Sequence, residues 1–259
     1  MAQKSAYELK GTPQLIIADG AGTLFDPKSI VPAYAFERTF LEEGIDTDIP
    51  TICLYMGMEK IKHIELLLKK SAVLEQFKEK YERTPDKEDI DRFYSIFQNQ
   101  LYPSAEETEE IEGVKEAAYR LKDAGIPLIM TTGYDRKMVD KTRKKLPWLD
   151  EVLTASFTSS DVEQGRPAPD MICLAMNEAG IETPAYAVKV GDTKVDVEAS
   201  DNASMPGIIV LSGSIETRDD AEKTNAEIGR EHLILPSFID VVNYTIDGTL
   251  PDKIKKLNN

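Results

Sequence analysis

The sequence predicts an α/β fold, in which a Rossmann-like, doubly wound parallel sheet carries an inserted α-helical domain. Apolar runs alternate with helical stretches over residues 114–211, the pattern of parallel strands joined by crossover helices. An earlier apolar run at 15–18 ends in a glycine-rich loop, as a buried strand would. Between these parts, residues 32–101 have helical spacing and no convincing strand, which indicates an insertion after the first strand.

The predicted elements follow in order along the chain. After the first strand come four helical stretches rich in Glu and Lys, at 33–43, 59–70, 73–81 and 87–101. Residues 104–112 form an acidic linker. Beyond it we expect strands at 127–131, 187–190 and 208–211, and helices at 114–124, 137–146, from about 170, and near 195–202. The stretch beyond residue 214 is harder to place, although 238–244 is typical of a closing helix.

This order predicts two domains. Residues 1–27 and 105–259 should form the α/β core, and residues 28–104 should form a helical cap. With 259 residues and 41% hydrophobic side chains, the chain can bury a substantial core.

The net charge of −15 argues against nucleic acids and anionic membranes as partners, because their phosphates would be repelled. Any phosphate chemistry would therefore need a local cationic site. The simplest explanation of the acidity itself is a solvated, aggregation-resistant surface. No apolar run approaches the roughly 18 to 20 residues of a membrane span. The first 14 residues lack the apolar centre of a secretory signal, and Cys53 and Cys173 have no metal-ligand spacing. A cytoplasmic location is the expectation.

Four loops contain candidate functional residues. In open parallel sheets, ligands bind beyond the carboxyl ends of the strands, so loops that follow strands are of special interest. Taken singly, each loop could be no more than a helix cap, a turn or a surface charge. Together, in this order around one sheet, they predict one site. The loops are DGAGT at 19–23, TTGY at 131–134, GRPAP at 165–169 and GDTKVD at 191–196.

The chemistry of these loops is coherent. Asp19 and Asp192 can together hold a hard divalent cation, which prefers oxygen ligands. Thr132 and backbone amides can donate hydrogen bonds to phosphoryl oxygens, and Arg166 can supply positive charge. Asp196, four residues after Asp192, lies on the same helix face and can support the metal site through other residues.

These loops resemble the four sequence motifs of the haloacid dehalogenase superfamily, and the helical insertion resembles its cap. The resemblance covers residues from about 14 to 214. It implies that Asp19 attacks phosphorus and forms an aspartyl-phosphate, which water then hydrolyses. It also implies Mg²⁺ as cofactor, held by Asp19, the backbone carbonyl of Ala21 and Asp192.

Ala21 departs from the pattern of most phosphatases of this superfamily. They carry a second Asp two residues after the nucleophile, which protonates the leaving alkoxide. The phosphonoacetaldehyde hydrolase branch instead has Ala at this position. Cleavage of a C–P bond expels a carbanion, which needs an electron sink rather than an acid. An imine between a lysine and the substrate aldehyde provides such a sink.

The segment MGMEKIKH at 56–63 resembles the cap motif of that branch. The resemblance implies that Lys60 forms the imine, that His63 assists it directly or through water, and that Met56 packs beside it. On a helix Lys60 and His63 share a face with Ile64, and these surroundings would lower the pKa of Lys60. Taken alone, an exposed lysine and a core histidine would be the ordinary interpretation. The 131–134 loop also resembles that branch and implies substrate contacts from Thr132, Gly133 and Tyr134.

The expected function is hydrolysis of phosphonoacetaldehyde, a small phosphonate, to acetaldehyde and phosphate. A hydrolase of another small phosphorylated or phosphonylated metabolite is the alternative, and a catalytically silent regulatory protein is a more distant one. The resemblance also implies a homodimer. Gly20 in place of a bulky residue, Ser29 near an expected cysteine and a divergent end beyond residue 214 are departures from that branch.

Overall fold

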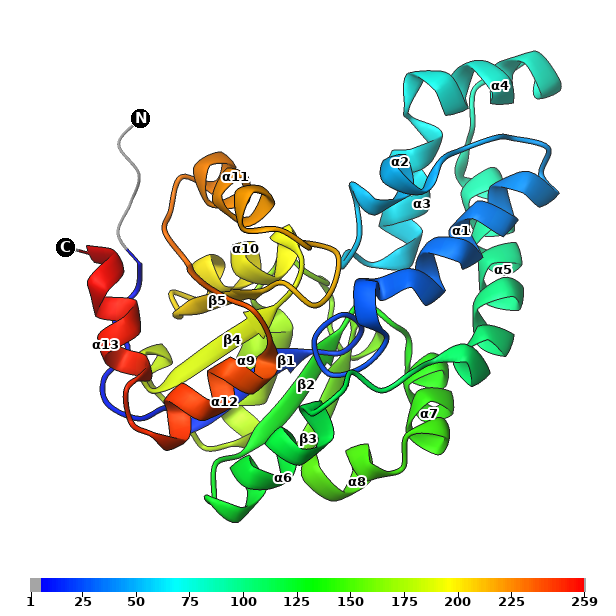
Figure 1. Cartoon of the computed structure of the whole chain (residues 1–259). Helices are drawn as coiled ribbons and strands as arrows, with labels where there is room; N and C mark the ends of the chain where they lie inside the picture. The colour runs from blue at the N-terminus through cyan, green and yellow to red at the C-terminus, as the bar shows by residue number, and fades with distance from the viewer. Residues whose placement is uncertain (1–5, 259) are drawn as a thin grey trace.

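The computed structural model describes residues 6–258. Within that range a parallel six-stranded sheet has the order β3-β2-β1-β4-β5-β6 (Figure 1). This is the strand order of doubly wound dinucleotide-binding folds, so the predicted α/β fold class is confirmed. The strands are β1 (Leu15–Asp19), β2 (Leu128–Thr132), β3 (Ala155–Thr158), β4 (Ala187–Gly191), β5 (Gly207–Val210) and β6 (Leu233–Leu235).

The central strands are buried on both faces, which explains their continuous apolar runs. In β1, Leu15 and Ile17 pack against one helical layer, whereas Ile16 and Ala18 pack against the other. Ile17 lies opposite Ile129 of β2 in the parallel register. Because all strands run in the same direction, the loops that follow β1, β2 and β4 meet at one edge of the sheet.

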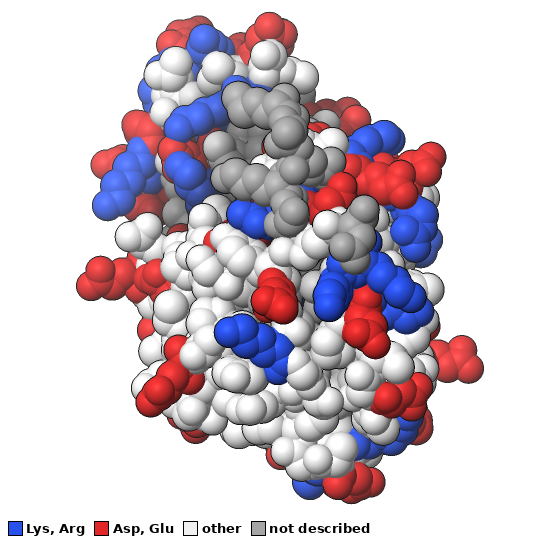
Figure 2. Space-filling model, turned by 90° about the vertical axis from the view of Figure 1, so that its left-hand side faces the viewer, with Lys and Arg blue, Asp and Glu red and all other residues white. Residues whose placement is uncertain are grey.

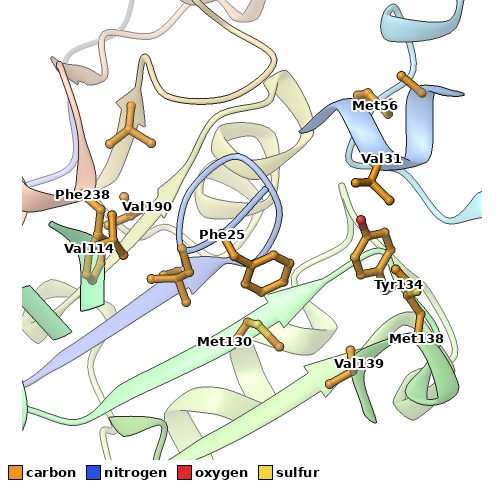
Figure 3. Packing of buried hydrophobic residues seen from close by; sticks show 14 of the residues in the cluster. Phe25, Val31, Met56, Val114, Met130, Tyr134, Met138, Val139, Val190 and Phe238 are labelled. Carbon is orange, nitrogen blue, oxygen red and sulfur yellow. The ribbon is translucent and has the colours of Figure 1, made fainter. Parts of the chain in front are cut away.

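Helices cover both faces of the sheet, as Figure 1 shows. One layer contains α9 (Asp170–Glu178), α10 (Lys194–Asn202) and α11 (Arg218–Ile228). The opposite layer contains α6 (Val114–Asp123) and α12 (Phe238–Ile246), while α7 (Arg136–Lys145) and α8 (Trp148–Val152) follow β2. The C-terminal helix α13 (Leu250–Lys255) packs beside α12. Figure 3 shows Val114 and Phe238 close together over the sheet, where they contribute to its largest apolar cluster.

Of the six α-helices between β1 and β2, the first five form the helical insert, residues 30–104. They stand apart from the helices that flank the sheet (Figure 1). Their apolar core includes a stack of Phe36 on Phe97, with ring centroids 4.2 Å apart, and a contact of Phe40 with Phe93. The helices are α1 (Ile30–Glu42), α2 (Ile49–Cys53), α3 (Lys60–Leu68), α4 (Ser71–Tyr81) and α5 (Lys87–Ser104).

The structure adds elements that the sequence did not predict. These are two strands, β3 and β6, and the short helices α2, α8 and α13, together with α11 in the stretch that was hard to place. The helix predicted at 238–244 is confirmed as α12, but it does not close the chain, because α13 follows it. The loop at 165–169 does not follow a strand directly, since the 3-10 turn Ser159–Asp161 lies between it and β3. The domain boundaries at 27/28 and 104/105 stay predictions, and residues 1–5 and 259 lie outside the described part.

The surface carries charges of both signs. Figure 2 shows Lys and Arg side chains interspersed with Asp and Glu on one face, without a continuous basic patch there. From residue 6 to residue 258, no helix has both the length and the apolar character that a membrane span requires.

Candidate active site

A small cavity lies between the carboxyl edge of the sheet and the helical insert. Its volume is about 20 Å³, room for one water molecule. It brings together eight of the residues predicted from sequence, which come from three separate loops of the core and from the insert. These residues are Asp19, Ala21, Met56, Lys60, Thr132, Gly133, Tyr134 and Arg166.

Asp19 at the end of β1 belongs to a buried charge network. Arg166 Nη1 lies 2.9 Å from Asp19 Oδ1 and also contacts the carboxylate of Asp196. Lys189 Nζ, on β4, lies 2.7 Å from Asp196 Oδ1. Burial opposes ionisation of Asp196, but Arg166 and Lys189 hold its pKa below the ordinary value. Asp196 therefore remains a carboxylate that orients the guanidinium of Arg166 beside Asp19.

Three carboxylates of this site could hold a metal ion. One oxygen each from Asp19, Asp192 and Asp196 lies within 4.8 Å of the others. Burial, followed by repulsion from Asp19 and Asp196, raises the pKa of Asp192 to about 7. Burial likewise raises the pKa of Asp19, although Arg166 opposes this. A buried group of carboxylates with excess negative charge suits a hard divalent cation.

The side chain of Asp192 is held by donors from three segments. Thr23 Oγ1 donates to Oδ1 at 3.0 Å, while Ser29 Oγ and the backbone N–H of Ser214 donate to Oδ2 at 3.2 and 2.8 Å. Gly213 packs so closely that a Cβ there would lie 2.0 Å from Asp192 Oδ2. These contacts fix the orientation of the carboxylate before any ligand binds.

The loop after β2 faces the helical insert. The hydroxyl of Thr132 accepts a hydrogen bond from the backbone N–H of Tyr134 at 3.2 Å. At Gly133, a Cβ would lie 2.8 Å from the carbonyl oxygen of Met58 and 2.9 Å from that of Gly57. Only glycine allows the insert to approach this loop so closely. The hydroxyl of Tyr134 is buried and has no hydrogen-bond partner within the described part of the chain.

Lys60 is the first residue of α3 and is 7% exposed. Its Nζ lies 5.6 Å from the ring centroids of both Phe36 and Tyr134. Burial, followed by repulsion from Arg166, lowers the pKa of Lys60 to about 8. The amine is thus neutral in an appreciable fraction of molecules near neutral pH, unlike an exposed lysine.

His63 does not line the cavity but lies buried behind Lys60. Its ring centroid is 4.0 Å from that of Phe36, and its Nε2 lies 2.9 Å from the carbonyl oxygen of Ile52. A carbonyl only accepts hydrogen bonds, so Nε2 carries the proton and Nδ1 is the free base. Burial, followed by repulsion from Lys60, lowers the pKa of His63 well below its ordinary value. His63 is therefore neutral here.

Sequence reasoning missed several residues of this site. Lys189 could have been suspected as a single charge inside an apolar strand. Thr193 lines the cavity and caps α10 together with Asp196, and the spacing Thr-x-x-Asp is a sign of such a capping box. Gly57 touches Thr193 closely, since a Cβ at Gly57 would lie 2.4 Å from Thr193 Oγ1. No pattern in the sequence indicates that contact.

Comparisons with known proteins identify the family of the chain. The model of the haloacid dehalogenase-like hydrolase family matches residues 16–210. A protein of Parabacteroides distasonis named phosphonoacetaldehyde hydrolase is 33% identical over 254 residues, covering 94% of this chain and 96% of that protein. A Bacillus cereus protein of the same name is 30% identical over 226 residues, 85% of each chain.

Solved structures show the same fold. A protein from Oleispira antarctica described as phosphonoacetaldehyde hydrolase-like superimposes with a TM-score of 0.83 at 24% identity, covering 99% of this chain and 98% of that one. A hydrolase from Pseudomonas syringae gives a TM-score of 0.72 at 18% identity, covering 90% of this chain and 98% of that one. The predicted family is confirmed: the chain belongs to the haloacid dehalogenase-like hydrolases.

Proposed function

We propose that this hydrolase cleaves the carbon–phosphorus bond of phosphonoacetaldehyde, releasing acetaldehyde and phosphate. The observation that carries the proposal is the position of Lys60: a buried amine with a pKa lowered to about 8 lines the same cavity as Asp19. Ala21 lines that cavity too, where a phosphatase would need an acid. The relatives named phosphonoacetaldehyde hydrolase, at 30 to 33% identity, support the same substrate.

The first part of the proposed reaction belongs to Lys60. Its neutral amine adds to the aldehyde carbon, and loss of water gives an imine. His63 lies behind Lys60 with a free Nδ1, and we propose that it accepts a proton through a water molecule. Met56 and Tyr134, which line the cavity, would then pack around the imine.

The second part belongs to Asp19. Its carboxylate attacks phosphorus, the C–P bond breaks, and the bonding electron pair passes into the protonated imine to give a neutral enamine. Arg166 and the backbone amides of the Thr132–Gly133 loop would bind the phosphonate oxygens. Protonation of the enamine at carbon and hydrolysis of the imine release acetaldehyde and free Lys60, and water hydrolyses the aspartyl-phosphate.

We further propose that the metal is Mg²⁺, bound by Asp19, Asp192 and the backbone carbonyl of Ala21. When bound, Mg²⁺ would neutralise phosphonate charge and orient the phosphorus for attack. Asp196 would support the metal site without binding the ion itself, since its carboxylate already pairs with Arg166 and Lys189.

The helical insert would act as a cap. A cavity of about 20 Å³ is too small for phosphonoacetaldehyde, so the substrate requires the insert to move away from the sheet. We propose that residues 28–104 open as one body for entry and close again to bring Lys60 against Asp19 and exclude water.

We also propose a homodimer formed through the insert. Tyr34 and Leu41 are 42% and 53% exposed and lie seven residues apart, on one face of α1. Such large apolar side chains favour a partner surface. Sedimentation of the wild type against Leu41→Glu tests this, and a wild type that sediments as a monomer would contradict it.

Acetaldehyde release tests the proposed function. With phosphonoacetaldehyde and Mg²⁺, the protein should release equal amounts of acetaldehyde and phosphate. Alcohol dehydrogenase with NADH measures the acetaldehyde, and a phosphate assay measures the phosphate. Phosphate release from phosphate esters, without acetaldehyde release from the phosphonate, would favour a phosphatase. Absence of both activities would favour a regulatory protein.

A further inference from the structure

Asp26 lies where the chain passes from the core into the helical insert. Its backbone N–H donates to the carbonyl of Glu109 at 2.8 Å, and Glu109 lies in the segment where the chain returns to the core. Its own carbonyl accepts from the backbone N–H groups of Gly22 and Ser29, each at 3.0 Å. This residue therefore links both connections of the insert to the loop that follows β1.

The side chain of Asp26 provides an acceptor that the first turn of α1 otherwise lacks. Ser29, just before α1, has a left-handed φ of 52° and makes no side-chain capping hydrogen bond. Oδ1 of Asp26 instead accepts from the backbone N–H of Val31 at 3.4 Å. Free N–H groups and the helix dipole both favour a carboxylate at this position. Asp26 thus orients the start of α1.

The helix α1 supports the candidate lysine. Pro32 in its first turn lines the cavity. Further along, Phe36 has its ring centroid 5.6 Å from Lys60 Nζ and 4.0 Å from the ring centroid of His63. A change in the direction of α1 would therefore move the surface on which the Lys60 amine rests.

Asp26 also acts on Lys60 through its charge. Its Oδ2 is buried and accepts no hydrogen bond from the residues that the structure describes. Burial raises the pKa of Asp26 to about 7. The charge of Glu109 acts in the same direction, whereas the amides of Val31 and Ile30 and the charge of Lys60 oppose the increase. In return, Asp26 raises the pKa of Lys60 against the effects of burial and Arg166.

Tyr134 lies near the same first turn of α1. In Figure 3 the hydroxyl of Tyr134 points toward Val31 at the start of α1. Burial, and then the charge of Asp26, raises the pKa of Tyr134 well above its ordinary value, so its phenol stays neutral. Asp26 and Lys60 are both buried, and charges inside a protein interact more strongly than they would in water.

We propose that Asp26 is a positioning residue for Lys60, which joins the two connections of the insert, orients α1 behind the lysine and places a negative charge near its amine. The inference rests on the proposed role of Lys60 as the imine-forming residue. It adds a residue outside the four loop motifs and outside the lysine segment to the machinery of the site.

The test compares three variants by the pH dependence of Lys60 acetylation with acetic anhydride, followed by peptide mass spectrometry. Asp26→Asn keeps a side-chain oxygen for Val31 but removes the negative charge that favours the protonated amine. The midpoint of the pH dependence of Lys60 acetylation should therefore move to lower pH by about half a unit. Asp26→Glu keeps the charge and should keep the wild-type midpoint. Asp26→Ala loses both features, and its kcat should fall by about 10- to 100-fold while its KM changes less.

Glu109→Gln is the matched control, because it removes an exposed carboxylate from the same pair of connections and should leave the midpoint of Lys60 unchanged. An unchanged midpoint in Asp26→Asn, or an equal change in Glu109→Gln, would overturn the proposal. If Asp26→Asn does not fold, a midpoint displaced in Asp26→Glu would overturn it instead. Acetylation needs no substrate, so this result is separate from acetaldehyde release, which tests the proposed function itself.

Discussion

The guanidinium of Arg166 lies beside the carboxylate of Asp19, with Nη1 2.9 Å from Oδ1, and both side chains are at least 95% buried. Arg166 also contacts Asp196, so one cation is shared by two carboxylates. Although burial opposes its ionisation, these two carboxylates raise the pKa of Arg166 above the ordinary value. The site therefore depends on Arg166 for charge balance, in addition to the phosphonate binding that we propose for it.

Replacement of Arg166 by Ala should lower the free energy of unfolding by about 3 to 5 kcal/mol, because buried carboxylates lose their partner. Mg²⁺ should restore part of this loss, since it would neutralise the same group of carboxylates. Thermal unfolding with and without Mg²⁺ measures both effects.

Arg143→Ala serves as the control, because the ion pair of Arg143 with Asp150 is partly exposed, with side chains 31% and 55% accessible. It should cost no more than about 1 kcal/mol and respond little to Mg²⁺. Equal losses of unfolding free energy in the two variants would contradict the view that the buried network stabilises the protein more than a partly exposed ion pair does.

Replacement of Asp19 by Asn should lower kcat by at least about 10⁴-fold, because an amide cannot attack phosphorus. The fold should persist, since Asn keeps the size of the side chain. Rapid-quench measurement with the wild type should also detect a phosphorylated protein whose label maps to Asp19. Near-normal turnover in Asp19→Asn would rule out the assigned nucleophile.

Replacement of Asp192 by Asn should weaken Mg²⁺ binding by about 10- to 100-fold or more, since one charged ligand becomes neutral. Calorimetric titration of Mg²⁺ measures this directly. In the wild type, EDTA should stop turnover and added Mg²⁺ should restore it. Full activity in excess EDTA would exclude a metal-dependent reaction.

The main parts of the fold were predictable because β1, β2, β4 and β5 are short, mainly apolar runs that end at or near a glycine. The strand β3 escaped prediction because its four residues, ASFT, are half polar and alternate between buried and partly buried positions. The strand β6 has only three residues and lies at the edge of the sheet, so its periodicity is too short to recognise.

The site was predictable where function depends on a local motif. Asp19, Thr132, Arg166 and Asp192 each stand in a loop of recognisable chemistry, and the structure places them near one another. The contact of Phe36 with Lys60 could not be predicted, because it depends on how α1 packs against α3. Packing between helices leaves no fixed spacing in the sequence.

The rate should depend on pH through Lys60. Imine formation needs the neutral amine, and the pKa of Lys60 is about 8. Below that pH the protonated fraction grows, so kcat/KM should fall about tenfold for each pH unit, and above it the rate should level off. A pH profile at saturating Mg²⁺ checks this, and a rate that rises steadily from pH 8 to 10 would indicate an ordinary, exposed lysine.

Borohydride trapping tests the central claim most directly. When borohydride is added together with phosphonoacetaldehyde, the enzyme should lose activity irreversibly, and peptide mapping should find one reduced adduct, on Lys60, among the 22 lysines of the chain. Lys60→Arg keeps the charge but cannot form an imine, so it should bind phosphonate without releasing acetaldehyde. Trapping on another lysine, or acetaldehyde release by Lys60→Arg, would contradict the account.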